Sequence, residues 1–252
     1  MNRHFVKNMR RAALALAAAA LVLLGLTLSS CGKTAGTASQ PVIVCFVRHG
    51  EAASNIDGVY AGKNTESRLT ENGREQAALL GKAVSFITFD RAYCSEMTRT
   101  KETGDIILEN NVNPVPKVEV NAGFDEIDFG KADGMTSAEA RAAFGDNLFG
   151  TYDDAGFSSP TGGESASELA NRINTAMTAV VSASGNAGKT ILITGHSSAG
   201  WWLQSMWPDR CADSLKNGSV TVLKYQGGQW NLLLYNETDF TDFETRYTEE
   251  VR

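Results

Sequence analysis

Proline and cysteine are scarce in this sequence, which has 5 and 4 of them among 252 residues. These counts, together with 24 glycines, exclude a collagen-like or disulfide-dense protein. A hydrophobic fraction of 42% excludes an intrinsically disordered chain. The sequence also lacks internal repeats and low-complexity blocks, so we expect one compact domain.

Acidic residues are absent from the first thirty positions, which carry Arg3, Lys7, Arg10 and Arg11. The formal net charge of −6 therefore becomes −10 once these four basic residues are left aside. The rest of the chain is acidic enough to repel a phosphate backbone, which disfavours nucleic acid as a partner. A small basic pocket inside an acidic protein is still compatible with these counts.

The N-terminal pattern is typical of a secretory signal, because residues 12–28 are uncharged and follow the basic residues. This run is somewhat short for a permanent membrane anchor, which is the alternative. Leu28-Ser29-Ser30-Cys31 is similar to the lipobox of bacterial lipoproteins, whose cysteine is lipidated and becomes the new N-terminus. We therefore expect a signal peptide at 1–30 and a flexible tether at 31–40. A lipid on Cys31 would hold the protein to a bacterial membrane on its extracytoplasmic side.

The body, residues 41–252, alternates strand-like and helix-like patterns. Residues 41–47 (PVIVCFV) and 189–194 (KTILIT) have the apolar, β-branched pattern of strands buried in a parallel sheet, and 91–94 and 117–120 are weaker candidates. Apolar residues recur at helical spacing from 77 to 84 and from 164 to 180. The tail predicts a hairpin between 219–225 and 230–235. These elements predict a layered α/β fold.

Three cysteines remain in the body, which is an odd number. Cys45 and Cys94 lie in strand-like apolar runs, so we expect them to be buried, unreactive thiols. Nothing in the spacing of these two and Cys211 indicates a disulfide.

Histidine is rare, and both histidines of the body follow predicted strands. The strand at 41–47 leads directly into Arg48-His49-Gly50-Glu51, and the strand at 189–194 leads into Gly195-His196. Ligands of parallel α/β sheets bind beyond the carboxyl ends of the strands, and neighbouring strands lie about 4.8 Å apart. We therefore expect the two imidazoles to face one small ligand.

Two further strand ends add an arginine and a carboxylic acid. Arg99 follows the strand at 91–94 and falls in the first turn of a predicted helix, where free N–H groups favour an anion. Glu126 follows the strand at 117–120. Taken alone, Arg99 fits a surface charge paired with Glu96 or Glu102, and Glu126 fits a solvated loop acid. Together with Arg48 and the histidines, they predict a phosphate site with a proton donor.

The ordered motifs of the body resemble the histidine phosphatase superfamily in its phosphoglycerate mutase-like branch. The matching segments are RHGE at Arg48–Glu51, LTENGREQA at Leu69–Ala77, CSEMTRTKET at Cys94–Thr103, DEIDFGKADG at Asp125–Gly134, GGES at Gly162–Ser165 and TGHSSAG at Thr194–Gly200. The resemblance implies a three-layer α/β/α fold with a mostly parallel central sheet. It also implies a phosphate pocket built by Arg48, His49, Arg99 and His196, with Asn55 at its rim and Glu126 as proton donor.

The implied activity is hydrolysis of a small-molecule phosphomonoester. His49 would attack phosphorus and form a phosphohistidine, which water then cleaves. Arg48, Arg99 and His196 would stabilise the transferring group, and a protonated Glu126 would donate to the leaving oxygen. No metal and no other cofactor is expected, because the arginines beside each histidine oppose a dication.

Three departures from the family pattern bear on the substrate. Ala52 stands where a threonine is common, Ala132 replaces a frequent tryptophan, and Ser197-Ser198 replaces a pair of small residues. None of these removes a charge from the predicted pocket.

Other functions remain as alternatives. Gly195-His196-Ser197 is similar to the nucleophile elbow of an α/β-hydrolase, but no histidine follows Ser197, as that triad order requires. A triad in which His49 serves Ser197 explains neither arginine. Phosphoglycerate mutases of the family carry an adjacent arginine pair after the glutamate, and residues 127–195 hold no adjacent basic pair. A surface lipoprotein that binds a phosphate ligand without turnover is the third alternative.

Substrate choice is expected to depend on residues 136–163. The aromatic residues of this segment would cover the pocket mouth or belong to the core, and these are Phe144, Phe149, Tyr152 and Phe157. Asp153-Asp154 would disfavour highly phosphorylated substrates if they face the pocket.

Overall fold

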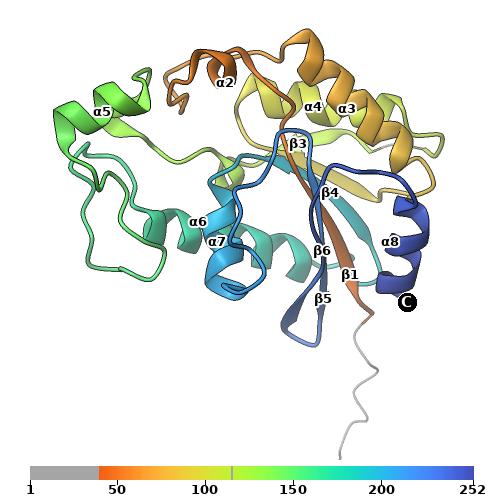
Figure 1. Ribbon diagram of the computed structural model, residues 1–252. Helices are drawn as coiled ribbons and strands as arrows, with labels where there is room; N and C mark the ends of the chain where they lie inside the picture. Colours follow the sequence, from red (N-terminus) through yellow and green to blue (C-terminus); the bar gives the residue numbers. More distant parts are fainter. Residues whose placement is uncertain (1–39, 115) are drawn as a thin grey trace, which may run out of the picture. The chain divides into compact units, whose positions relative to one another are not determined.

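The fold is built on one six-stranded sheet with the strand order β3-β2-β4-β1-β5-β6 (Figure 1). The structure is a computed structural model that describes residues 40–114 and 116–252. The first four strands in that order pair in parallel, and β5 and β6 continue the sheet through antiparallel pairs. The strands are β1 (Val42–Arg48), β2 (Arg91–Cys94), β3 (Val118–Val120), β4 (Thr190–Gly195), β5 (Val220–Gln226) and β6 (Gln229–Glu237).

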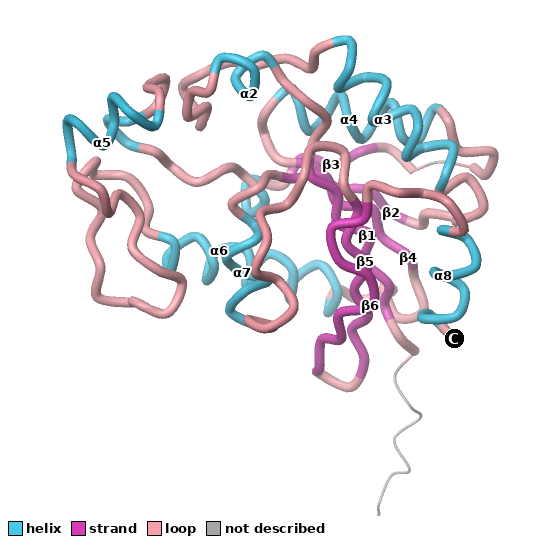
Figure 2. Tube along the Cα trace, in the orientation of Figure 1, coloured by secondary structure: helices cyan, strands magenta, loops and turns pink. Residues whose placement is uncertain are grey.

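Helices cover both faces of this sheet, as Figure 2 shows with the strands in magenta between helices in cyan. The α-helices are α2 (Ala53–Asp57), α3 (Glu71–Ala83), α4 (Thr98–Glu109), α5 (Ser137–Phe144), α6 (Ala166–Ser182), α7 (Ala199–Met206) and α8 (Phe243–Val251). Two short 3-10 helices are η1 (Ala122–Phe124) and η2 (Gly130–Ala132).

Alternation along β1 explains the two layers of helices. Val42, Val44 and Phe46 join a core cluster with α6 and α7, whereas Ile43, Cys45 and Val47 join a second cluster with α3, α4 and α8. Because successive side chains of a strand point to opposite faces, a strand that is apolar throughout requires cover on both sides. The predicted three-layer α/β/α fold with a mostly parallel central sheet is therefore confirmed.

The elements predicted from the sequence are present. The strand predicted at 91–94 has those bounds, β1 and β4 are shifted by one residue at both ends, and β3 begins one residue later than predicted. The predicted hairpin is formed by β5 and β6, whose turn contains Gly227 and Gly228 at φ values of 60° and 83°. The C-terminal helix α8 has no counterpart among the predicted elements.

The three cysteines of the body are free and buried. Burial raises the pKa of Cys45 to about 12 and that of Cys94 to about 11, so both thiols stay protonated at neutral pH. The prediction of buried, unreactive thiols at Cys45 and Cys94 is confirmed.

The predicted signal peptide at 1–30 lies outside the described residues, as do Cys31 and the tether at 31–40 apart from Gln40. Within residues 40–114 and 116–252, every helix is too short or too polar to cross a bilayer.

Two long excursions between strands meet beyond the carboxyl end of the sheet. The first follows β1 and includes α2, and the second follows β3 and includes α5. They are joined by two backbone hydrogen bonds of 2.8 Å, from the Tyr60 N–H to the Met135 carbonyl and from the Gly134 N–H to the Tyr60 carbonyl. The space between the strand ends and these excursions is where the predicted site residues lie.

The loop that follows β1 is fixed against the first turn of α3 by close backbone contact. A Cβ atom on Gly73 would lie 1.9 Å from the Glu51 carbonyl oxygen, and one on Gly50 would lie 2.2 Å from the Gly73 carbonyl oxygen. Thr70 caps α3 by accepting from the Gly73 N–H, and its own N–H donates to the Glu51 carbonyl at 2.9 Å. Glycine at 50 and 73 is therefore a steric requirement of the loop that carries His49.

We expect Gly73→Ala to lower the free energy of unfolding by about 1–3 kcal/mol, because the added methyl group overlaps backbone that cannot rotate away. Gly156→Ala is the matched control, since a Cβ there meets only an Asp154 side-chain oxygen at 3.6 Å. Urea unfolding of both variants measures the difference. Equal midpoints for the two variants would contradict the steric argument.

Candidate active site

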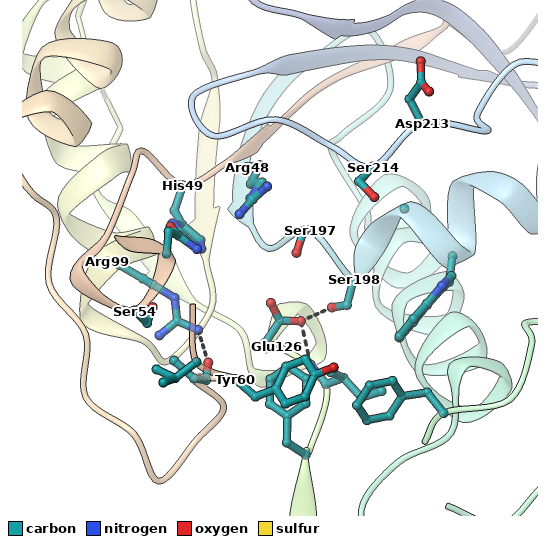
Figure 3. A pocket seen from close by; sticks show the side chains of 18 of the residues that line it. Arg48, His49, Ser54, Tyr60, Arg99, Glu126, Ser197, Ser198, Asp213 and Ser214 are labelled. Carbon is teal, nitrogen blue, oxygen red and sulfur yellow. Dashed lines mark hydrogen bonds between the residues drawn. The ribbon is translucent and has the colours of Figure 1, made fainter. Parts of the chain in front are cut away.

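The segments that follow three strands bring predicted residues to one cavity of about 510 Å³. Arg48 and His49 come from the end of β1, Arg99 from the start of α4 after β2, and Glu126 from the loop after η1. Asn55 of α2 lies at the same cavity. Figure 3 shows the first four converging on its centre.

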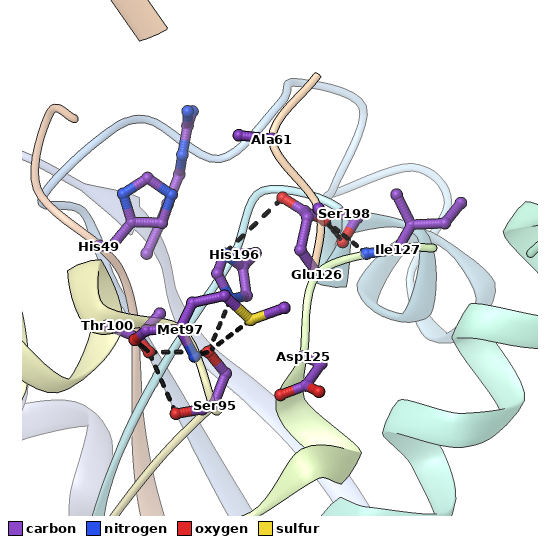
Figure 4. Close-up of polar contacts among 12 residues, drawn as sticks. His49, Ala61, Ser95, Met97, Thr100, Asp125, Glu126, Ile127, His196 and Ser198 are labelled. Carbon is purple, nitrogen blue, oxygen red and sulfur yellow. Dashed lines mark hydrogen bonds and ion pairs between the residues drawn. The ribbon is translucent and has the colours of Figure 1, made fainter. Parts of the chain in front are cut away.

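The parallel register of β1 and β4 explains why the two histidines are neighbours. Arg48 is paired with Gly195, so the next residue of each strand is a histidine. The ring centroids of His49 and His196 lie 5.3 Å apart. His196 lies behind the cavity lining, with its Nδ1 3.8 Å from Oε2 of Glu126 (Figure 4).

His49 is held as a neutral imidazole with one defined tautomer. Its Nδ1 lies 2.7 Å from the Gly50 carbonyl oxygen, which can only accept, so Nδ1 carries the proton and Nε2 carries the lone pair. Burial lowers the pKa of His49 well below its usual value, and the positive charges of Arg99 and Arg48 lower it further. Nε2 is therefore available as a nucleophile.

His196 is also neutral, and a chain of hydroxyl groups sets its tautomer. Its Nε2 lies 2.8 Å from Oγ of Ser95, which lies 2.7 Å from Oγ1 of Thr100. Thr100 donates its proton to the Met97 carbonyl at 2.8 Å, so Ser95 donates to Thr100 and accepts from Nε2–H of His196. The Nδ1 lone pair of His196 then faces Glu126, and this buried atom has no hydrogen-bond partner in the described part of the chain.

Burial is the largest cause of the low pKa of His196, and Arg99, His49 and Arg48 add to it. Ser95 and Thr100 were not predicted as site residues. Their signal in the sequence is the polar stretch that directly follows the strand at 91–94.

Both arginines are held by backbone carbonyls, and Arg99 is buried whereas Arg48 is half-buried. Arg99 is 2% exposed and donates through Nη2 to the Ala61 carbonyl at 2.7 Å, and Arg48 donates through Nη1 to the Leu215 carbonyl. Burial lowers the pKa of both guanidinium groups, while the charge of Glu126 raises it. An arginine remains protonated under these conditions, so the cavity holds two fixed positive charges.

The alternative of a surface ion pair for Arg99 is wrong. Glu96 pairs with Lys63 at 2.9 Å, and Glu102 pairs with Arg74 at 3.4 Å. The solvated-loop alternative for Glu126 is also wrong, because Glu126 is 9% exposed.

Both oxygens of the Glu126 carboxyl group have distinct surroundings. Oε1 accepts from the Ile127 N–H at 2.9 Å and from the Ser198 hydroxyl group (Figure 4). Oε2 faces His196. Oε1 thus already accepts two hydrogen bonds, and Oε2 is the oxygen that is left to exchange a proton.

Arg172 of α6 fixes the loop that carries Glu126. It donates to the Asp125 carbonyl at 3.1 Å and to the Glu126 carbonyl at 3.3 Å, and its charge is balanced by Glu164 at 2.6 Å. Sequence reasoning placed Glu164 in a family motif but did not find Arg172. The helical spacing of eight residues between them was the available signal.

The aromatic residues around the cavity differ from those predicted. Phe149 lines the cavity, and Phe144 and Tyr152 pack against the core, which was the alternative expectation, whereas Phe157 belongs to neither set. Asp153 and Asp154 are not among the residues that line the cavity. The prediction that they disfavour highly phosphorylated substrates required them to face the pocket, and they do not line it.

Three aromatic residues at the cavity were missed. They are Tyr60, Phe129 and Trp201. Ser197 also lines the cavity, but no hydrogen bond joins it to His49 among the described residues, and His49 Nδ1 is occupied by Gly50.

We expect each histidine to make the fold less stable in acid, because His49 and His196 stay neutral when folded and bind a proton when unfolded. The free energy of unfolding then falls as the pH drops below about 6.5, and the contribution vanishes above that pH. Between pH 7 and pH 5 the loss is about 2 kcal/mol for each histidine. Urea unfolding of His196→Asn at both pH values should show a smaller loss than the wild type. An equal loss would mean that His196 is charged in the folded protein.

The sequence matches the model of the histidine phosphatase superfamily (branch 1) over residues 44–238. It is 30% identical over 157 residues to 2,3-bisphosphoglycerate-dependent phosphoglycerate mutase 2 of Gloeobacter violaceus, covering 62% of this chain and 71% of the relative. It is 29% identical over 197 residues to the uncharacterized phosphatase PhoE of Bacillus subtilis, covering 77% of this chain and 93% of the relative.

Solved structures show the same fold. A phosphoglycerate mutase from Bacillus anthracis superposes with a TM-score of 0.70 at 22% identity, over 81% of this chain and 96% of the other. A mycobacterial glucosyl-3-phosphoglycerate phosphatase superposes with a TM-score of 0.66 at 20% identity, over 78% and 99%. The family match spans most of the body and includes both strand ends that carry histidine, so this chain belongs to the histidine phosphatase superfamily and is a phosphoryl-transfer enzyme.

Proposed function

We propose that the protein hydrolyses phosphomonoesters through a phosphohistidine on His49. The observation that carries this proposal is the neutral imidazole of His49, whose Nε2 lone pair is free and whose pKa is lowered by the charges of Arg99 and Arg48. A nucleophile of this kind beside fixed positive charge suits attack on a dianionic phosphate.

The reaction has two balanced steps. In the first, Nε2 of His49 forms a bond to phosphorus, the bond from phosphorus to the ester oxygen breaks, and the proton of Glu126 moves to the leaving alcohol. In the second, water attacks phosphorus, its proton returns to Glu126, and the bond from Nε2 to phosphorus breaks to release inorganic phosphate. The two steps together consume one water and leave the enzyme unchanged.

Arg48 and Arg99 supply the fixed charge for both steps. Phosphoryl transfer needs stabilisation of the charge spread over the equatorial oxygens, and two guanidinium groups held by backbone carbonyls provide it without reorganisation. A phosphate dianion against Nδ1 of His196 favours protonation of that nitrogen. His196 then donates through Nδ1 to a phosphoryl oxygen, which gives a partner to a buried atom that has none among the described residues.

Ser198 is a positioning residue for the proton donor. Its hydroxyl group and the Ile127 N–H both bind Oε1 of Glu126, so the proton leaves from Oε2.

Asn55 accepts from the Ala52 N–H and from Asn217 at 3.0 Å each, which orients it at the rim of the cavity.

A hydrolase is favoured over a phosphoglycerate mutase by the charge of the cavity. Apart from Arg48 and Arg99, no lysine or arginine is among the described residues that line it. A mutase must hold the carboxylate of its substrate through the reaction, and an unpaired anion in a partly buried site is unfavourable.

We expect His49→Ala to lower kcat for p-nitrophenyl phosphate by at least about 10³-fold, because it removes the nucleophile. Arg99→Ala should lower it by about 10² to 10³-fold. Arg68→Ala is the matched control, since its side chain is 74% exposed and Arg68 does not line the cavity. Quenching the wild type in alkaline detergent during turnover of phosphorus-labelled substrate should trap a phosphoenzyme that is stable in alkali and lost in acid, and that His49→Ala lacks.

Two outcomes would contradict the proposal. Turnover retained in His49→Ala would exclude His49 as the nucleophile. A wild-type protein that binds phosphate but hydrolyses none of a panel of phosphomonoesters would favour the alternative of a phosphate-binding lipoprotein.

We also propose that a lipid on Cys31 anchors the enzyme to a bacterial membrane on its extracytoplasmic side. The support is the lipobox-like sequence that ends at Cys31, after a basic and then apolar segment. We expect the wild type to fractionate with membranes and to incorporate labelled fatty acid, and Cys31→Ser to incorporate none. Fatty-acid labelling of Cys31→Ser equal to that of the wild type would exclude this anchor.

A further inference from the structure

The cavity is larger than a phosphate group needs, and its remaining wall is aromatic. Four rings line it beside the phosphate centre, and they are Tyr60, Phe129, Phe149 and Trp201. Phe129 is buried and the other three are half-buried, so the rings keep exposed surface on the cavity side. In Figure 3 the Tyr60 ring lies below Glu126, on the side of the cavity away from His49.

These rings support one another and form one continuous wall. Tyr60 stacks on Phe129 at a centroid distance of 4.7 Å, and Phe149 meets both of them edge-on at 5.6 Å. Trp201 extends the wall from Phe149 at 5.9 Å. The wall combines both strand excursions with α7, and the contacts between its rings hold it in one arrangement.

The wall offers no partner for a second anion. Outside the phosphate centre, Asp213 is the one charged side chain among the described residues that line the cavity. Its carboxylate points away from Arg48 in Figure 3, and its sign repels an anion. The polar groups on this side are neutral, and Gln204 and Ser214 are examples.

We propose, on the basis of the phosphatase function above, that the substrate is the monophosphate ester of an uncharged, ring-bearing alcohol. The phosphate binds Arg48 and Arg99, and the ring packs against Phe149 and Trp201. Offset or edge-on contact with such rings strengthens binding by about tenfold beyond ordinary apolar burial. A carboxylate or second phosphate on the alcohol would lose hydration here without gaining a cation.

The test compares esters whose alcohols leave with similar difficulty. Benzyl phosphate has a neutral ring, glycerol 1-phosphate is neutral without a ring, and 3-phosphoglycerate carries a carboxylate. With the full chain in detergent, we expect kcat/KM for benzyl phosphate to exceed that for glycerol 1-phosphate by about tenfold. We expect 3-phosphoglycerate to be poorer than both.

Substitutions in α7 and just after it locate the preference. Trp201→Ala should lower the ratio of kcat/KM for benzyl phosphate over glycerol 1-phosphate by about tenfold, through KM, and Trp201→Phe should recover most of it. Trp207→Ala is the matched control, because Trp207 packs against Trp202 and does not line the cavity. Its ratio should equal that of the wild type.

Binding of benzylphosphonate, which cannot be hydrolysed, separates this inference from the proposed function. Calorimetry should show tighter binding of benzylphosphonate than of phosphonoacetate in the wild type. That preference without turnover of any ester would support the ring site and refute the phosphatase. Turnover of the three esters at similar kcat/KM, or a ratio that Trp201→Ala leaves intact, would refute the ring site and keep the phosphatase.

Discussion

The parallel pairing of β1 with β4 is the constraint on which the site depends. Its register sets Arg48 opposite Gly195, so the chain leaves both strands at the same level and delivers a histidine from each. Neither strand is free to slide, because a shift of one residue would turn every apolar side chain of β1 to the wrong helical layer. The spacing of the two imidazoles is thus fixed by the hydrophobic core and not by contacts of the imidazoles themselves.

Burial and charge then act together on these imidazoles. Two guanidinium groups in a poorly solvated cavity oppose any further positive charge, which keeps both histidines neutral. The same two charges attract a dianionic phosphate. The groups that keep the nucleophile neutral therefore also favour binding of the ligand. Among the described residues, Glu126 is the one carboxylate that lines this centre, and three separate groups, Ser198, Ile127 and Arg172, hold it or its loop.

Much of this arrangement was available from the sequence because the charged residues follow apolar strands. His49 and His196 were predicted as site residues in this way. The same argument, together with the family motifs, supported the prediction of Arg99 and Glu126 as site residues. The positioning residues were not found in this way. Ser95 meets His196 across a separation of 101 residues, and Ser198 meets Glu126 across 72, so their roles depend on tertiary proximity that no local pattern reports.

The aromatic wall was predicted only in part for a related reason. Phe149, Phe144 and Tyr152 are aromatic residues of one segment and were all candidates for the pocket mouth. Phe149 lines the cavity, whereas Phe144 and Tyr152 pack against the core. Trp201 lies in the first turn of the apolar helix α7 and is followed by the buried Trp202, so the two neighbouring indoles look alike in the sequence. Helical geometry alone turns one of them to the cavity and the other to the core.

The two excursions that meet through Tyr60 and Met135 have a consequence for how such enzymes diversify. Three of the four rings belong to these excursions, whereas the arginines and the nucleophile belong to strand ends or the first turn of a helix. Substitutions at these ring positions would change the alcohol that is recognised, whereas Glu126 and the Ala61 carbonyl that holds Arg99 lie on the same excursions and must keep their places. The side chains that bind the alcohol can therefore change in such an enzyme while the reaction stays the same.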